Sequence, residues 1–102
     1  VLSRVVSANQ PDMVTTDAGL KAFSTDADPP VIAYGPKGAS YGFFGDEYGK
    51  VRLADGGQAR AGEAVVCVTP HCDPTVNLYG HYVIIRGSEV VDRWPTAGGK
   101  YR

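Results

Sequence analysis

Short apolar runs alternate with polar segments along the whole chain, and 13 glycines and 7 prolines punctuate them. The runs are rich in valine, isoleucine, tyrosine and phenylalanine, and none shows a sustained helical period. This pattern predicts β-strands over residues 1–7, 13–16, 31–34, 41–45, 50–53, 64–69, 81–86 and 89–94, and the start of another over 77–79. The run 64–69 is the clearest candidate for a buried strand. Many short strands at close spacing indicate an all-β domain, either a small barrel or a sandwich.

The best-defined connection joins the last two expected strands. Gly87-Ser88 separates residues 81–86 from 89–94, and glycine stands at the first central position, as a type II′ turn requires. We therefore expect a tight hairpin at this point. The tail from Pro95 follows the last apolar run and is expected to be frayed.

Composition and charge narrow the class of protein. The chain has 102 residues, of which 43% are hydrophobic and 21% charged, which suits one soluble domain. A net charge of -1 argues against a nucleic-acid partner. The absence of a run of ~20 apolar residues or a signal-peptide pattern argues against a membrane-spanning segment and favours a cytoplasmic location.

Cys67 and Cys72 are expected to be thiols. The chain begins at Val1, its only methionine is Met13, and we expect it to be part of a longer protein.

The segment Pro70-His71-Cys72-Asp73-Pro74 carries the main candidate chemistry. Two prolines favour an extended backbone, in which residues two apart point to the same side. His71 and Asp73 would then project together, with Cys72 facing away. One nitrogen and one oxygen donor suit zinc, manganese or magnesium and leave positions open, as in a catalytic site. The same spacing also suits solvated loop residues or turn formers.

Other polar residues have weaker claims. Asp17 in its Asp-Ala-Gly turn is a candidate for the edge of an active site, but its carboxylate also suits capping of that turn. Asn77 and Cys72 are candidates for residues that contact the metal ligands without binding the metal themselves. His81 opens an expected strand and is interpreted as a surface residue. No residue of this chain is assigned a catalytic or organic-cofactor-binding role.

Several separated blocks together resemble one enzyme family. They are residues 1–7, 17–24, 41–47, 71–79, 82–86 and 90–95, and they are similar to the carboxyl-terminal part of D-threonine aldolases and the related D-serine dehydratases. The resemblance implies an alanine-racemase-like enzyme, with an amino-terminal α/β barrel that binds pyridoxal phosphate on a lysine. Residues 1–102 would then be its carboxyl-terminal β-domain, and the barrel would be absent from this chain.

The resemblance also implies a site. In the aldolases a His-x-Asp segment holds a divalent metal (manganese, magnesium or zinc), and its ligands correspond to His71 and Asp73. In the dehydratases a cysteine takes the second position, so Asp73 favours the aldolase branch. Two features depart from the family. The barrel is absent, and with it the cofactor lysine, a role that is not assigned to Lys21. Tyr48 stands where relatives often have histidine.

The implied function is cleavage of D-β-hydroxy-α-amino acids to glycine and an aldehyde, with pyridoxal phosphate held by the missing barrel. The expected partners are that barrel, the D-amino-acid substrate and a second subunit in a full-length homodimer. Alternatives are a D-serine dehydratase, an amino-acid racemase, or a non-catalytic β-module for binding or dimerisation. The isolated chain is expected to be inactive and to expose an apolar face that other parts of the protein would cover.

Overall fold

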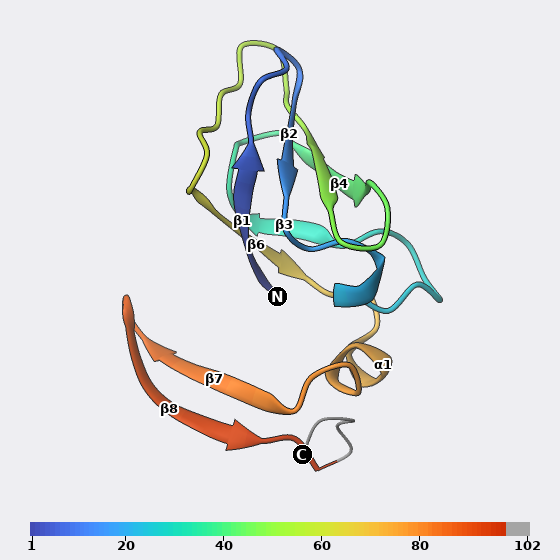
Figure 1. The fold of residues 1–102 in the computed structure, drawn as a ribbon, viewed down its shortest axis with the longest axis vertical. Helices are drawn as coiled ribbons and strands as arrows, with labels where there is room; N and C mark the ends of the chain where they lie inside the picture. The colour runs from blue at the N-terminus through green and yellow to red at the C-terminus, as the bar shows by residue number, and fades with distance from the viewer. Residues whose placement is uncertain (98–102) are drawn as a thin grey trace.

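The computed structural model describes residues 1–97 (Figure 1). Almost all of its regular structure is β, which confirms the predicted fold class. The elements are β1 (Leu2–Ser7), β2 (Met13–Thr16), the 3₁₀ turn η1 (Leu20–Ala22), β3 (Val31–Tyr34), β4 (Ser40–Phe43), β5 (Gly49–Arg52), β6 (Ala64–Val68), α1 (Cys72–Val76), β7 (His81–Arg86) and β8 (Glu89–Pro95).

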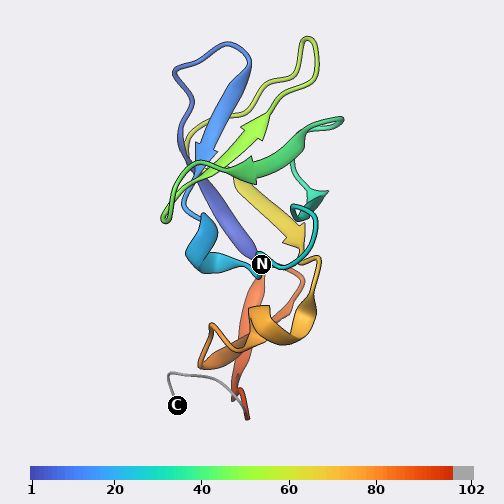
Figure 2. The same cartoon turned by 90° about the vertical axis from the view of Figure 1, so that its right-hand side faces the viewer.

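The first six strands form one antiparallel sheet in the order β3-β6-β1-β2-β5-β4. The sheet curls so that its two edge strands, β3 and β4, approach each other, and the result is a nearly closed barrel (Figures 1 and 2). Strands β7 and β8 form a separate two-stranded sheet that lies apart from the barrel. Helix α1 lies at the junction between the two.

Alternation of side chains determines what the barrel buries. In β1, Ser3 and Val5 point inward, whereas Leu2 and Val6 are exposed. In β6 the apolar run is continuous in sequence but buried on one face only, because Val68 is 60% exposed. The strand expected at 64–69 is therefore present over Ala64–Val68, and its inward residues Val65 and Cys67 are buried. An antiparallel barrel strand has one inward and one outward face, whatever the hydrophobicity of the outward residues.

The barrel core contains both apolar side chains and a buried hydroxyl pair. Thr16 donates a hydrogen bond to the Tyr41 hydroxyl over 2.6 Å, and Tyr41 donates to the Ala18 carbonyl, also over 2.6 Å. Gly49 lies against this pair, and a Cβ there would collide with both hydroxyl groups. The residue must therefore be glycine for the tyrosine to cross over β5. The apolar core consists of Val5, Val14, Ala18, Phe23, Tyr41, Val51, Val65 and Cys67.

The β7–β8 hairpin confirms the predicted turn. Gly87 has a φ of 63°, and no non-glycine residue in the described chain has a positive φ, which is the sign pattern of a type II′ turn. The strand continues through Pro95, and Thr96 is buried and donates to the Tyr79 carbonyl over 2.7 Å. The prediction of fraying from Pro95 is therefore wrong for Pro95 and Thr96. Ala97 is exposed, and the rest of the predicted tail, residues 98–102, lies outside the described chain.

The hairpin exposes much of its apolar surface, as expected for a chain that other parts of a protein cover. Most side chains of β7 and β8 are exposed. The large apolar residues among them are Tyr82, Val83, Ile85, Val90, Val91 and Trp94. No helix within residues 1–97 is both long enough and apolar enough to cross a bilayer.

The segment after β6 differs from its prediction. Residues 72–76 form a short helix rather than an extended stretch, and 77–78 form a turn, so no strand begins at 77–79. Tyr79 donates its backbone N–H to Val76 over 3.1 Å. Pro74 is tolerated because it lies in the first helical turn, where its missing N–H has no intrahelical partner to lose. Two prolines therefore restrict this backbone without keeping it extended.

Candidate functional site

His71 stands immediately before α1, in extended conformation with φ −132° and ψ 112°. Its backbone carbonyl lies within hydrogen-bond distance of three hydroxyl groups, those of Ser24 at 3.0 Å, Thr69 at 3.2 Å and Thr75 at 2.9 Å. The backbone of His71 is thus fixed by side chains from three elements of the chain. Its imidazole remains 49% exposed and accessible to a ligand.

Thr75 is the buried member of this hydroxyl cluster. Its Oγ1 accepts the backbone N–H of Ser24 over 2.9 Å and lies 2.6 Å from the Thr69 hydroxyl. Thr75 also donates to the His71 carbonyl, so one side chain links the loop after η1 to the start of α1. Hydrogen bonds satisfy every buried side-chain polar atom in the described chain.

A carboxylate from a distant loop meets the His71 side chain. Asp26 Oδ2 lies 2.5 Å from His71 Nδ1, although 45 positions separate the two residues. This hydrogen bond lowers the pKa of the Asp26 carboxyl below its usual value. The sequence alone assigns no role to Asp26, because nothing in a single sequence indicates which loops meet.

The other residues of the predicted site lie on α1. Cys72 and Asp73 occupy its first turn and are exposed, and Asn77 ends it, with its backbone N–H bonded to the Asp73 carbonyl. Because residues 72–76 are helical, the extended geometry that predicted a common direction for His71 and Asp73 is wrong. The choice of these two residues as a metal-binding pair therefore rests on the family resemblance alone.

The donor set still fits a divalent cation. His71 supplies an accessible imidazole and Asp73 an exposed carboxylate, which are nitrogen and oxygen ligands of the kind that zinc, manganese and magnesium accept. Residues 1–97 contain no group of three or more histidine, cysteine or acidic side chains placed to hold a metal. A cation bound by this pair would therefore take its remaining ligands from water, substrate or other parts of a longer protein.

Asp17 pairs with the backbone of β1, and its place at the edge of an active site stays a prediction. Its carboxylate accepts the backbone N–H of Arg4 over 2.9 Å, and its own N–H donates to the Arg4 carbonyl over 3.2 Å. Asp17 thus continues the pairing between β1 and β2 instead of capping its own turn. His81 is exposed on β7, in agreement with its interpretation as a surface residue.

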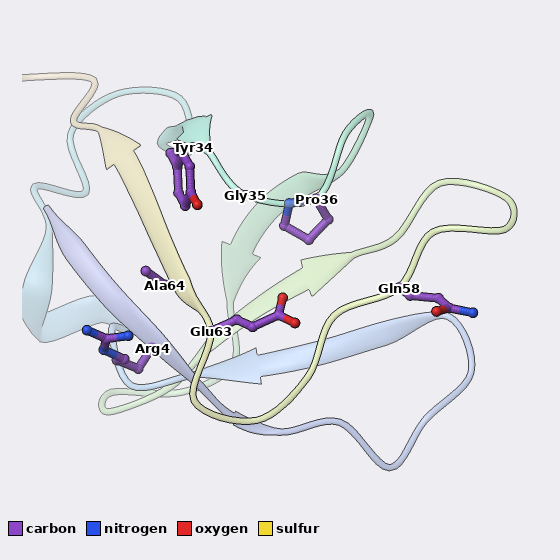
Figure 3. Close-up of a pocket in the computed structure, with 7 residues that line it drawn as sticks. All are labelled: Arg4, Tyr34, Gly35, Pro36, Gln58, Glu63 and Ala64. Carbon is purple, nitrogen blue, oxygen red and sulfur yellow. The ribbon is translucent and has the colours of Figure 1, made fainter. Parts of the chain in front are cut away.

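Two cavities in the described part of the chain adjoin the barrel, and Thr69 and Thr75 of the hydroxyl cluster line the second. One, of about 550 Å³, opens on the barrel beside Arg4, Tyr34 and Glu63 (Figure 3). The other, of about 720 Å³, lies between the barrel and the β7–β8 hairpin and is lined largely by apolar side chains. Neither is lined by His71 or Asp73. The predicted metal ligands are therefore on an accessible surface rather than inside a closed pocket.

The two cysteines should differ in reactivity. Burial raises the pKa of Cys67 to about 11, whereas Cys72 is exposed on α1. At pH 8 only about one thousandth of a thiol with that pKa is ionised, and the thiolate is the reactive form. We expect iodoacetamide to modify Cys72 in the folded chain, and both thiols after denaturation, as measured by mass spectrometry. Modification of folded Cys72→Ser at the wild-type rate would contradict this assignment.

Comparisons with known proteins give a consistent result. The family described as "putative serine dehydratase domain" matches residues 1–85. A D-threonine aldolase from Arthrobacter sp. is 42% identical over 95 residues, which cover 92% of this chain and 25% of that protein. A 3-hydroxy-D-aspartate aldolase from Paracoccus denitrificans is 38% identical over 101 residues, which cover 98% of this chain and 26% of that protein.

A solved structure extends the agreement to the fold. The crystal structure of D-threonine aldolase from Filomicrobium marinum superposes with a TM-score of 0.82 at 30% identity, and the match covers 93% of this chain and 26% of that one. The chain thus spans about a quarter of the length of the curated relatives that it matches.

Proposed function

Because this chain belongs to the serine dehydratase domain family, we propose that it is the metal-bearing domain of a lyase that cleaves D-β-hydroxy-α-amino acids. One observation carries the proposal: the curated relatives are named for D-threonine and for 3-hydroxy-D-aspartate, which are both D-amino acids with a hydroxyl on the β-carbon. A further domain of a longer protein would hold pyridoxal phosphate, as the family resemblance implies.

The proposed reaction breaks the bond between the α- and β-carbons. The β-hydroxyl loses its proton, the β-carbon becomes the carbonyl carbon of an aldehyde, and the α-carbon gains a proton to give glycine. Pyridoxal phosphate would supply an electron sink for the charge left at the α-carbon. A divalent cation would polarise the β-hydroxyl and lower its pKa.

In this proposal, His71 and Asp73 hold the cation through the imidazole and the carboxylate. The hydroxyl cluster of Ser24, Thr69 and Thr75 fixes the backbone of His71 and so places the imidazole at a constant point on the surface. The exposure of both donors leaves room for substrate oxygen atoms beside the cation. Dehydration of D-serine is the second candidate, which the description of the matching family favours.

Activity assays of the full-length protein distinguish these two reactions. We expect D-threonine to yield glycine and acetaldehyde, and a metal chelator to abolish this activity. His71→Ala and Asp73→Asn should each lose bound metal, measured by elemental analysis of the purified protein, and lose activity with it.

His81→Ala is the matched control, because it removes the other histidine of this chain from an exposed strand. Its metal content and activity should equal those of the wild type. Formation of pyruvate from D-serine without cleavage of D-threonine would favour the dehydratase. Unchanged metal content in His71→Ala would refute the metal-binding role.

A further inference from the structure

The contact between Asp26 and His71 determines how the imidazole presents its nitrogen atoms. The Asp26 carboxylate can only accept a hydrogen bond, so the proton between Oδ2 and Nδ1 belongs to the imidazole. In a neutral imidazole that donates from Nδ1, the lone pair lies on Nε2. The contact therefore selects the tautomer in which Nε2 is free to bind a cation.

The loop that carries Asp26 is itself attached to the His71 segment. Two residues earlier, Ser24 donates its backbone N–H to Thr75 over 2.9 Å and its hydroxyl to the His71 carbonyl over 3.0 Å. Phe23, the residue before Ser24, is buried in the barrel core. Asp26 thus approaches His71 from a backbone that is held at the same place, which distinguishes this contact from a chance encounter of two surface side chains.

We infer that Asp26 is a positioning residue for the metal-binding site, holding the His71 ring in one orientation and one tautomer with Nε2 directed to the cation. This inference rests on the proposed function, since it takes His71 as a ligand. Carboxylates that accept the second N–H of a ligating imidazole generally raise the affinity of the site for metal, because they fix the ring and increase its basicity.

A purely structural role for the same contact makes a different prediction. Asp26 and His71 are both about half exposed, and ion pairs between such groups contribute little to folding stability. Removal of the carboxylate should therefore leave the fold intact. The effect to look for is on metal affinity and on the tautomer of His71.

The experiment uses the full-length protein stripped of metal and titrated calorimetrically with Mn²⁺ and with Zn²⁺. We expect Asp26→Ala to bind each ion about 10- to 100-fold more weakly than the wild type. Asp26→Asn keeps a neutral hydrogen-bond acceptor, and its metal affinity should lie between those of Asp26→Ala and the wild type. Asp28→Asn removes a carboxylate from the same loop but not from His71, and should bind like the wild type.

A second readout does not involve metal. In metal-free protein labelled with ¹⁵N-histidine, the His71 signal, identified by its absence in His71→Ala, should show a protonated Nδ1 and an unprotonated Nε2. Asp26→Ala should show a mixture of both tautomers, while its thermal unfolding stays close to that of the wild type.

The outcomes separate this inference from the function on which it rests. Loss of metal in His71→Ala, with wild-type affinity and tautomer in Asp26→Ala, would overturn the role of Asp26 and leave the proposed function standing. Normal metal binding in His71→Ala would overturn both. Weaker binding in Asp26→Ala together with a mixed tautomer would support the inference.

Discussion

Replacement of Phe23 by alanine is expected to lower the free energy of unfolding by about 3 to 5 kcal/mol. Phe23 is 2% exposed, and its ring meets Tyr41 edge-on at a centroid distance of 5.6 Å and Phe43 at 5.9 Å. Truncation would open a cavity where three aromatic rings now fill the barrel. Since domains of this size are stable by only about 5 to 15 kcal/mol, much of the chain's stability would be lost. Urea denaturation of the 102-residue chain, followed by circular dichroism, measures the effect.

Phe44→Ala is the matched control. The same side chain is removed one residue beyond β4, where it is 52% exposed and lies 4.7 Å from the Lys50 ammonium group. An exposed cation–π contact is worth about 0.5 to 1 kcal/mol, so the loss should be small. Equal losses for the two variants would contradict the assignment of Phe23 to the core.

Most of the fold could be predicted from local patterns in the sequence. Alternating apolar residues and turn formers indicated the strands, because an antiparallel strand buries one face and its connections need glycine or a polar residue. The glycine of the β7–β8 turn is the clearest case, since its positive φ follows directly from its position in the hairpin. The family indicated by the separated sequence blocks is also confirmed, by a match over residues 1–85.

Contacts between distant segments could not be predicted in this way. Helix α1 has five residues, too few for a helical period to appear in the sequence. The neighbouring hydroxyl groups of Ser24 and Thr69 come from other parts of the chain. Asp26 meets His71 only because the barrel brings the loop after η1 beside the end of β6. A single sequence contains no signal for this contact between Asp26 and His71. The metal ligands, by contrast, were predicted from the family resemblance.

The hydroxyl cluster explains why the polar segment after β6 has a defined backbone at all. A short helix in isolation is unstable, because its first turn fixes several dihedral angles for few hydrogen bonds. Here Thr75 connects that turn to Ser24 and to the carbonyl before the helix, in a buried setting where each bond is hard to replace by water. The stability of the segment and the placement of His71 thus depend on the same side chain.

Thr75→Val tests that dependence, because valine has nearly the shape of threonine but carries a methyl group in place of the hydroxyl. The substitution leaves the Ser24 N–H without its acceptor in a buried place, and we expect it to lower the free energy of unfolding by about 1 to 3 kcal/mol. Helix propensity changes little, since both residues are β-branched. In the full-length protein the affinity for Mn²⁺ should fall as well, because the His71 carbonyl loses the Thr75 hydroxyl that lies 2.9 Å from it.

Thr75→Ser provides the control that separates the hydroxyl from the methyl group. Serine keeps the acceptor for Ser24 and the donor to His71, and it loses a buried methyl worth about 0.8 kcal/mol. Its metal affinity should therefore remain close to that of the wild type, while that of Thr75→Val falls. If valine were tolerated as well as serine in both unfolding and metal titration, the buried hydroxyl would not be what holds His71 in place. The fixed backbone of the site would then have to come from Ser24 and Thr69 alone.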